Sequence, residues 1–211
     1  MTAYRTAVQA RAHNGQEAPF SVCVFCGSRT GVRPLYSTLA TALGHRLAAA
    51  RIRLVYGGGS IGLMGVLARA ALERGGTVTG VIPRFLEKME VAQTGLSELV
   101  RVTSMHERKA HMASLANAFV ALPGGTGTLD ELIETTTWAQ LGLHDKPIFL
   151  LGPADYWRPL RALIDHMVAE GFAARDTASL MRHPDGLDAL MPALEALRGT
   201  SATASGTTRL S

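Results

Sequence analysis

The fold of this chain is decided by one stretch of sequence, Ala118-Phe119-Val120-Ala121-Leu122-Pro123-Gly124-Gly125-Thr126-Gly127-Thr128-Leu129-Asp130-Glu131. The apolar run over residues 118–122 indicates a buried strand, and Leu129, Leu132 and Ile133 recur at helical spacing after the turn. The glycines therefore lie at a strand-to-helix junction. The first backbone N–H groups of a helix lack partners there and the helix dipole is positive, so the junction favours a bound phosphate.

The same residues also fit a helix start that binds nothing. Thr128-Leu129-Asp130-Glu131 matches the capping box, with Thr128 as N-cap and Glu131 reaching back to its N–H. A second glycine loop favours the functional interpretation, because Gly57-Gly58-Gly59-Ser60-Ile61-Gly62 follows the apolar run 52–56 and opens a helical pattern over 63–74. Two loops of this kind in one small domain favour phosphate binding over two simple turns.

Short β-branched runs alternate with longer helical patterns along the chain. The predicted strands lie near residues 20–25, 52–56, 77–82, 99–103, 118–122 and 147–151. The predicted helices lie near residues 34–50, 62–74, 105–117, 128–141, 155–170 and 186–197. Repeated strand-helix-strand units require parallel strands with right-handed crossovers. We therefore predict an α/β fold, a single-domain, Rossmann-like, doubly wound parallel sheet flanked by helices.

Such a sheet binds its ligands outside the carboxyl ends of its strands. Both glycine loops, and the turn Cys26-Gly27-Ser28-Arg29 after the first predicted strand, fall at that edge. The sequence therefore predicts one ligand site at this edge of the sheet.

Length and composition predict one domain of this kind. The chain has 211 residues, of which 47% are hydrophobic and 18% charged. We expect one Rossmann-like domain over 19–198. The two ends are polar and unpatterned, so we expect a disordered N-terminal tail over 1–18 and a disordered C-terminal tail over 199–211.

The overall composition also limits the partners. No apolar run approaches the ~20 residues that span a bilayer, and the N-terminus lacks an apolar signal region, so we expect a cytoplasmic protein without a membrane partner. The net charge of +4 comes from arginines scattered along the chain rather than from a basic run. Small anionic ligands fit this balance, and we expect no nucleic-acid partner.

Two cysteines, Cys23 and Cys26, have the CxxC spacing of a redox pair or of half a metal site. Both fall within the strand-like run 20–26, where residues three apart point to opposite faces, and no second cysteine pair completes a zinc site. We expect reduced core thiols. His106 and His111 lack a partner at metal-ligand spacing, so surface or capping roles are favoured and no metal is predicted.

The loop Gly57-x-Gly59-x-x-Gly62 matches the dinucleotide fingerprint that an oxidoreductase would use. That interpretation requires an acidic residue at the end of the next strand for the ribose hydroxyls, whereas this strand ends in Pro83-Arg84. Neither glycine loop ends in the Gly-Lys-Ser/Thr of a Walker A loop, and neither contains a lysine for a pyridoxal Schiff base. The phosphate is therefore expected to anchor the ligand, while the reaction takes place at another part of the ligand.

Three motifs, in this order, resemble the signatures of the Lonely Guy (LOG) family: GGGSIGLMG over 57–65, MHERK over 105–109 and PGGTGTLDE, of the form PGGxGTxxE, over 123–131. The resemblance extends over residues 20–171. Family members are cytokinin riboside 5′-monophosphate phosphoribohydrolases, many of which were once labelled lysine decarboxylases. The resemblance implies an N-glycosidase without a cofactor, which hydrolyses AMP or an N6-substituted adenosine 5′-monophosphate such as N6-isopentenyl-AMP to ribose 5-phosphate and the free base, adenine or a cytokinin.

The resemblance also implies which residues form the site. Arg108 and Glu131 would be the catalytic pair, and the glycine turn with Thr128 would hold the 5′-phosphate. Glu90 would help to seat the nucleotide, and Glu87 competes with it for that role. The implied substrate-binding residues are Ser28, Gly58, Gly59, Glu90, Lys109, Gly124, Gly125, Thr126, Gly127 and Thr128.

The chemistry of glycosidic cleavage suits these roles. Breaking the C1′–N bond builds positive charge on the sugar, which the Glu131 carboxylate can stabilise while it orients or deprotonates water. Arg108 is always protonated, so it would support the phosphoribosyl group or the leaving base rather than deliver a proton. The pattern alone favours a solvated helix position for Arg108. It also places Asp130 ~100° around the helix from Glu131, outside the same pocket.

Three questions stay open at this level. The LOG family forms homodimers through helices near Trp138, which implies a homodimer, whereas the pattern alone favours a core position for Trp138. The alternative function is a non-catalytic nucleotide or phosphorylated-cofactor carrier of the same fold, which needs the glycine cradle but not Glu131. Arg29, Arg84 and Met64 are the candidates for lining the base pocket.

Overall fold

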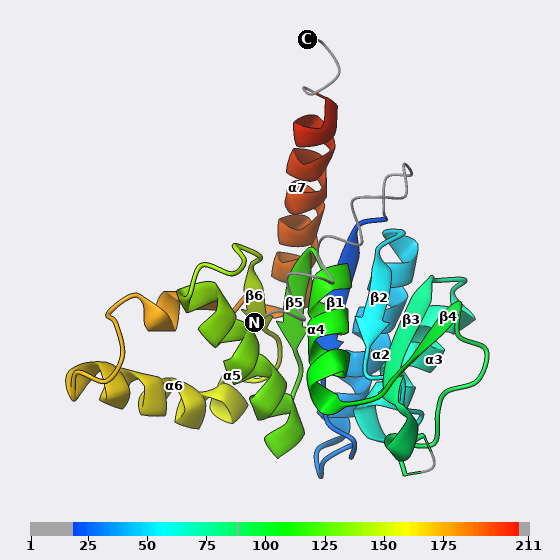
Figure 1. Cartoon of the computed structure of the whole chain (residues 1–211), viewed down its shortest axis with the longest axis horizontal. Coiled ribbons are helices and arrows are strands. Elements are labelled where there is room, and N and C mark those ends of the chain that lie inside the picture. The colour runs from blue at the N-terminus through cyan, green and yellow to red at the C-terminus, as the bar shows by residue number, and fades with distance from the viewer. Residues whose placement is uncertain (1–18, 88, 207–211) are drawn as a thin grey trace.

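The computed structural model describes residues 19–87 and 89–206, and the predicted tail over 1–18 lies outside them. Over these residues the chain forms a seven-stranded sheet flanked by helices (Figure 1). The strands are β1 (Ser21–Phe25), β2 (Arg53–Tyr56), β3 (Val78–Pro83), β4 (Glu98–Val102), β5 (Ala118–Ala121), β6 (Ile148–Leu150) and β7 (Met181–Arg182). All neighbours are parallel, in the order β4-β3-β2-β1-β5-β6-β7. This confirms the predicted doubly wound α/β sheet.

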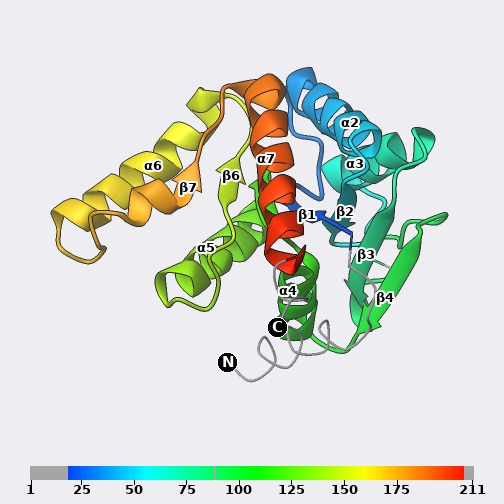
Figure 2. The ribbon, with the colours of Figure 1, turned by 90° about the horizontal axis from the view of Figure 1, so that it is seen from above.

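The helices cover both faces of the sheet (Figure 2). They are α2 (Pro34–Ala49), α3 (Gly62–Glu73), α4 (Met105–Leu115), α5 (Thr126–Gln140), α6 (Ala154–Ala169) and α7 (Gly186–Gly206). One buried cluster joins Val22 and Leu54 to α2, α3 and α7, and a second joins Val55 to α4, α5 and α6. Because adjacent strand residues serve different cores, a slip of one residue would exchange the faces, and this fixes the strand register.

The two cysteines fall on opposite faces of β1 and its continuation. Cys23 packs in the cluster under α4, α5 and α6, and Cys26 packs in the cluster under α2 and α3. Both are buried free thiols, which confirms the expected core positions. None of the described helices has an apolar stretch long enough to cross a bilayer.

Strand β1 lies where the strand order reverses. It pairs with β2 on one side and β5 on the other, so that Val22 lies opposite both Leu54 and Ala118. In a doubly wound sheet, ligands bind beyond the carboxyl ends of the strands at this point. The turns that leave β1, β2 and β5 therefore meet where a ligand is expected.

The predicted element boundaries agree with the structure to within two residues, except at the end of the last helix. Helix α7 continues to Gly206, so the domain boundary expected at residue 198 falls inside a helix, and residues 207–211 lie outside the described residues. Strand β7 has only two residues and was not predicted, because a period of two cannot be detected in so short a segment. Two 3-10 helices, η1 (Arg84–Leu86) and η2 (Thr177–Leu180), were also not predicted.

Candidate active site

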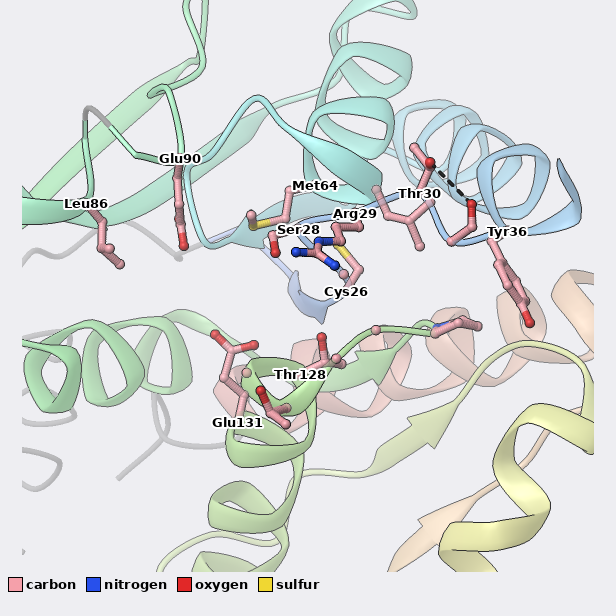
Figure 3. Close-up of a pocket in the computed structure, with 18 of the residues that line it drawn as sticks. Cys26, Ser28, Arg29, Thr30, Tyr36, Met64, Leu86, Glu90, Thr128 and Glu131 are labelled. Atoms are coloured by element: carbon pink, nitrogen blue, oxygen red, sulfur yellow. Dashed lines mark hydrogen bonds between the residues drawn. The ribbon is translucent and has the colours of Figure 1, made fainter. Parts of the chain in front are cut away.

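A cavity of about 510 Å³ opens at the carboxyl ends of β1, β2 and β5 (Figure 3). Its walls come from the turn after β1, the starts of α3, α4, α5 and α6, and the segment after β3. The predicted site residues that line it are Ser28, Glu90, Arg108, Gly124, Gly125, Thr126, Gly127, Thr128 and Glu131. The fold thus brings most of the predicted site together.

The N-terminus of α5 points its free backbone groups at this cavity. Gly125 is the N-cap, and among the described residues no side chain caps this helix. The capping-box prediction is wrong, because the helix begins at Thr126, two residues before Thr128, and Glu131 lines the cavity instead of reaching back. An uncapped first turn with a positive dipole is a favourable anion site.

The glycines of this turn serve two different purposes. A Cβ on Gly124 would lie 2.0 Å from Oγ1 of Thr128 and 2.8 Å from the nitrogen of Gly27, so the turn is too tight for any side chain. A Cβ on Gly125 or Gly127 would meet nothing within 4 Å. These two glycines therefore leave space on the cavity side, where an anion can approach the backbone.

The three turns at this edge are tied to one another. The Gly27 N–H donates to the Pro123 carbonyl at 3.1 Å, and the Leu63 N–H donates to the Gly27 carbonyl at 2.9 Å. Gly62 has φ +57°, and a Cβ there would lie 2.2 Å from the carbonyl carbon of Ser28. The turns after β1, β2 and β5 therefore form one unit.

Arg108 lies inside the protein rather than on a solvated helix face. The residue is only 3% exposed, so the interpretation of Arg108 as a solvated surface position is wrong. Its Nε donates to the Val81 carbonyl at 3.1 Å, and its Nη2 donates to the Gly57 carbonyl at 2.7 Å and to Oε2 of Glu90 at 3.0 Å. Arg108 thus places a fixed positive charge at the cavity wall.

The structure distinguishes the two competing glutamates. Glu87 pairs with Nε of Arg101 at 2.6 Å, whereas Glu90 lines the cavity and pairs with Arg108. The Glu90 backbone carbonyl also accepts the Ser60 N–H at 3.1 Å, which holds its segment against the second glycine loop. Glu90 is therefore the glutamate of this segment that belongs to the cavity.

Glu131 and Glu90 lie on opposite sides of the cavity. Figure 3 shows Glu131 and Thr128 on the α5 side, and Glu90 and Met64 across from them. Burial raises the pKa of Glu131 from 4.5 to about 7, the positive charge of Arg108 opposes this shift, and the Glu90 carboxylate adds to it. A carboxyl group with a pKa near neutrality can both accept and return a proton at physiological pH.

Three predicted site residues, Gly58, Gly59 and Lys109, are not among the described residues that line the cavity. Lys109 pairs with Asp130 and Glu134, at 3.0 Å each, and Asp130 is turned away from Glu131 as predicted. Gly58 has φ +81° and packs behind the wall, and Gly59 leaves room for the segment that carries Glu90. These residues support the wall rather than form it.

Several lining residues were not assigned from the sequence. Of the three candidates for the base pocket, Arg29 and Met64 line the cavity, and exposed Arg84 is not among its described lining residues. Tyr156, in the first turn of α6, also lines it and bonds to Gly124. The only sequence signal for Tyr156 was its place just after a strand, at the ligand edge of the sheet.

Metal ligands do not gather in the described part of the chain. Within residues 19–87 and 89–206, no group of three His, Cys, Asp or Glu side chains is placed to hold a metal ion. His111 is half-buried on α4, and burial lowers its pKa below 6.5.

These features define a Rossmann-like α/β protein whose cavity combines an anion-binding helix terminus, a buried arginine and two carboxylates. A family model described as "Possible lysine decarboxylase" matches residues 64–194. The chain is 50% identical over 175 residues to the cytokinin riboside 5′-monophosphate phosphoribohydrolase of Rhodococcoides fascians, a match covering 82% of this chain and 87% of that protein. It is 49% identical over 160 residues to the Oryza sativa subsp. japonica enzyme LOG, covering 76% and 66%. The chain belongs to this family, the LOG family.

Solved structures share the fold at lower identity. The molybdenum cofactor carrier protein of Chlamydomonas reinhardtii has a TM-score of 0.65 at 22% identity, covering 86% of this chain and 99% of that chain. The molybdenum cofactor binding protein of Rippkaea orientalis has a TM-score of 0.63 at 15% identity, covering 87% and 99%. At such identities the likeness establishes a common architecture.

Proposed function

We propose that this protein hydrolyses the N-glycosidic bond of adenosine 5′-monophosphates, N6-substituted ones in particular, to the free base and ribose 5-phosphate. The observation that carries the proposal is the position of Glu131, a half-buried carboxyl that lines the cavity with a pKa of about 7, one turn from the uncapped start of α5. Relatives about half identical to this chain over most of its length carry the name of this activity.

The 5′-phosphate binds at the start of α5. The free N–H groups of residues 126–128 and the open space beside Gly125 and Gly127 suit a phosphate dianion. A phosphate held there puts the attached ribose near Glu131, because both are set by the first two turns of one helix. The base extends toward Met64 and Arg29 on the far wall.

The reaction consumes one water molecule, and one proton of that water ends on the departing base. As the C1′–N9 bond breaks, its electron pair leaves with the base and the water oxygen bonds to C1′. Glu131 accepts the proton that this water releases, and the proton finally passes to a nitrogen of the departing base. Glu131 as a general base contributes about 10²–10⁴-fold to the rate.

Arg108 acts as a fixed charge rather than as an acid. Its hydrogen bonds to Val81, Gly57 and Glu90 hold the guanidinium in place, and an arginine does not release its proton at neutral pH. It therefore positions Glu90 and stabilises negative charge that develops on the leaving base.

Product analysis tests the proposed function. The purified protein is incubated at pH 8 with AMP or N6-isopentenyl-AMP, without added metal or cofactor, and the base and ribose 5-phosphate are measured by chromatography. We expect both products in equal amounts, and a higher kcat/KM for the N6-substituted nucleotide. Binding of both nucleotides without any release of base would instead support a nucleotide carrier.

Substitution of Glu131 gives the sharper test. Glu131→Gln should lower kcat by about 10²-fold or more while the Kd for AMP changes less than threefold, because the neutral amide keeps the shape but accepts no proton. Asp130→Asn is the matched control, since Asp130 is the exposed neighbouring carboxylate paired with Lys109. Full activity of Glu131→Gln, or equal loss in the control, would contradict the assignment.

We also propose a homodimer in a reducing, cytoplasmic compartment. Helices α5 and α6 expose Leu129, Ile133, Leu163 and Met167, which are 37–50% accessible. Exposed large apolar side chains four residues apart on each of the two helices favour burial against a second copy. The two cysteines are both free thiols, which suits a reducing compartment.

A further inference from the structure

Tyr156 contacts both polar backbone groups of one glycine in the phosphate-binding turn. Its hydroxyl accepts the Gly124 N–H at 3.0 Å and donates to the Gly124 carbonyl. Tyr156 lies 32 residues further along the chain, in the first turn of α6, so the contact joins two separate elements. Nothing in the local sequence of the turn requires this partner.

The ring of Tyr156 is itself held on two sides. It makes edge contacts with Tyr36 of α2, at 5.8 Å and 70°, and with Trp157, at 4.9 Å and 90°. Asp155, the preceding residue, pairs with Arg33 at 2.8 Å. The hydroxyl therefore reaches Gly124 from a packed and anchored position.

Gly124 is the last residue before the N-cap of α5, so its orientation sets the direction of the N–H groups that follow. Its own N–H and carbonyl are occupied by Tyr156 and are not offered to a ligand. On the other side, the Gly27 N–H holds the preceding Pro123 carbonyl. The turn is thus fixed between β1 and α6, with its free donors directed into the cavity.

We propose that Tyr156 is a positioning residue that orients the anion cradle at the start of α5 through Gly124. The identity of the anion as a 5′-phosphate rests on the proposed function. The hydroxyl is engaged by the backbone, so its effect falls on phosphate recognition rather than on proton transfer. Loss of the hydroxyl should weaken binding of the phosphate part of a ligand and spare the base part.

Tyr156→Phe tests this, because it removes the hydroxyl and keeps the ring contacts. We expect the Kd for ribose 5-phosphate, measured by calorimetry, to rise about tenfold, because the hydrogen bonds between the hydroxyl and Gly124 are lost. The Kd for the nucleoside N6-isopentenyladenosine should change less than twofold. In the hydrolysis assay KM for the monophosphate should rise about tenfold with kcat within threefold of the wild type.

Tyr56→Phe is the matched control. Tyr56 is fully buried outside the cavity lining, and its hydroxyl has no hydrogen-bond partner among the described residues, so its removal should leave both dissociation constants unchanged.

Three results would overturn the proposal. The first is an unchanged Kd of Tyr156→Phe for ribose 5-phosphate. The second is an equal loss of ribose 5-phosphate and nucleoside binding, and the third is a Tyr156→Phe protein without a cooperative melting transition. The second and third results would give the hydroxyl a general structural role. A wild-type protein that binds ribose 5-phosphate but releases no base contradicts the proposed hydrolase alone. The calorimetric comparison still decides the role of Tyr156 in that case.

Discussion

Gly127 and Gly65 both lie in the first turns of helices, and they differ in what a Cβ would meet. A Cβ on Gly127 meets nothing within 4 Å, whereas one on Gly65 would lie 1.8 Å from the carbonyl oxygen of Ser60. Gly127→Ala should therefore fold with equal or greater stability, by up to ~1 kcal/mol, because alanine favours a helix. It should nevertheless weaken ribose 5-phosphate binding about tenfold by filling the space beside the anion.

Gly65→Ala should show the opposite pattern, a loss of stability large enough to see in urea unfolding, because backbone must move to relieve the collision. Urea unfolding and calorimetry on the two variants check both statements. Tight phosphate binding by Gly127→Ala would mean that the anion lies elsewhere.

The raised pKa of Glu131 also affects stability. The folded protein keeps a proton on this carboxyl up to a pH of about 7, while an ordinary carboxyl in the unfolded chain loses it near 4.5. The wild type therefore loses stability as the pH rises from 4.5 to 7. Glu131→Gln removes this penalty, so it should be more stable than the wild type at pH 8 by about 1–3 kcal/mol.

Below pH 4 both states of the wild type are protonated, and the advantage of Glu131→Gln should disappear. Urea unfolding at the two pH values measures the difference. A variant that is less stable than the wild type at pH 8 would mean that the ionised carboxylate has a stabilising partner.

Some of the site could be predicted at this scale and some could not. The glycine turn and Glu131 are adjacent in sequence, so local spacing was enough to propose an anion cradle beside a carboxylate. The backbone partners of Arg108 come from β3 and from the turn after β2, and spacing alone placed this residue in solvent. Tyr156 meets Gly124 only through the packing of α6, which no local pattern records.

At the scale of elements, Lys109 joins α4 to α5. Its ammonium pairs with Asp130 and Glu134, which flank Glu131 on α5. The charge of Lys109 lowers the pKa of Glu131 and that of Asp130 raises it. Lys109→Met should therefore move the acidic limb of the kcat profile to higher pH, by about half a unit to one unit.

Asp130→Asn should move the same limb to lower pH, because it removes a negative charge beside Glu131. Profiles of kcat from pH 5 to 9 for both variants measure the two shifts. Shifts of the same sign in the two variants would rule out an electrostatic link from this cluster to Glu131.

Periodicity predicted most elements because each helix and strand carries its own apolar pattern. It placed the start of α5 two residues late, since Thr128 satisfies the residue preferences of an N-cap while the actual N-cap is Gly125. Thr128 is instead buried against Gly124. The competing preference was tertiary packing of the turn, which overrides a local cap.

For the whole molecule, the alternation of strand and helix patterns predicted the doubly wound sheet. It did not predict which apolar side chains lie on the outer surface. The helical spacing of Leu129, Leu132 and Ile133 predicts a core position for all three residues. In the structure Leu132 is fully buried, whereas Leu129 and Ile133 are 37% and 42% exposed. A helical stripe can serve two partners, the core and a second subunit, and the sequence of one chain does not separate them.

The proposed dimer gives a prediction at this scale. Leu163→Lys combined with Met167→Lys should convert a dimer into a monomer in sedimentation experiments, because two charges would be buried at the α6 contact. Leu35→Lys, an exposed apolar position on α2, should leave the dimer intact. A wild-type monomer at micromolar concentration would contradict the proposed assembly.

The pairing of β1 with β5 has a consequence for the order of events during synthesis. Strand β1 can pair with β5 only after Ala118, the partner of Val22, has been synthesised. The cavity lacks one of its walls until α5 has also been synthesised. Joining segments so distant in sequence costs loop entropy before any contact compensates for it, which makes folding slow. A ligand of this cavity can therefore stabilise only a nearly complete chain, so it acts on the last step of folding rather than on its nucleation.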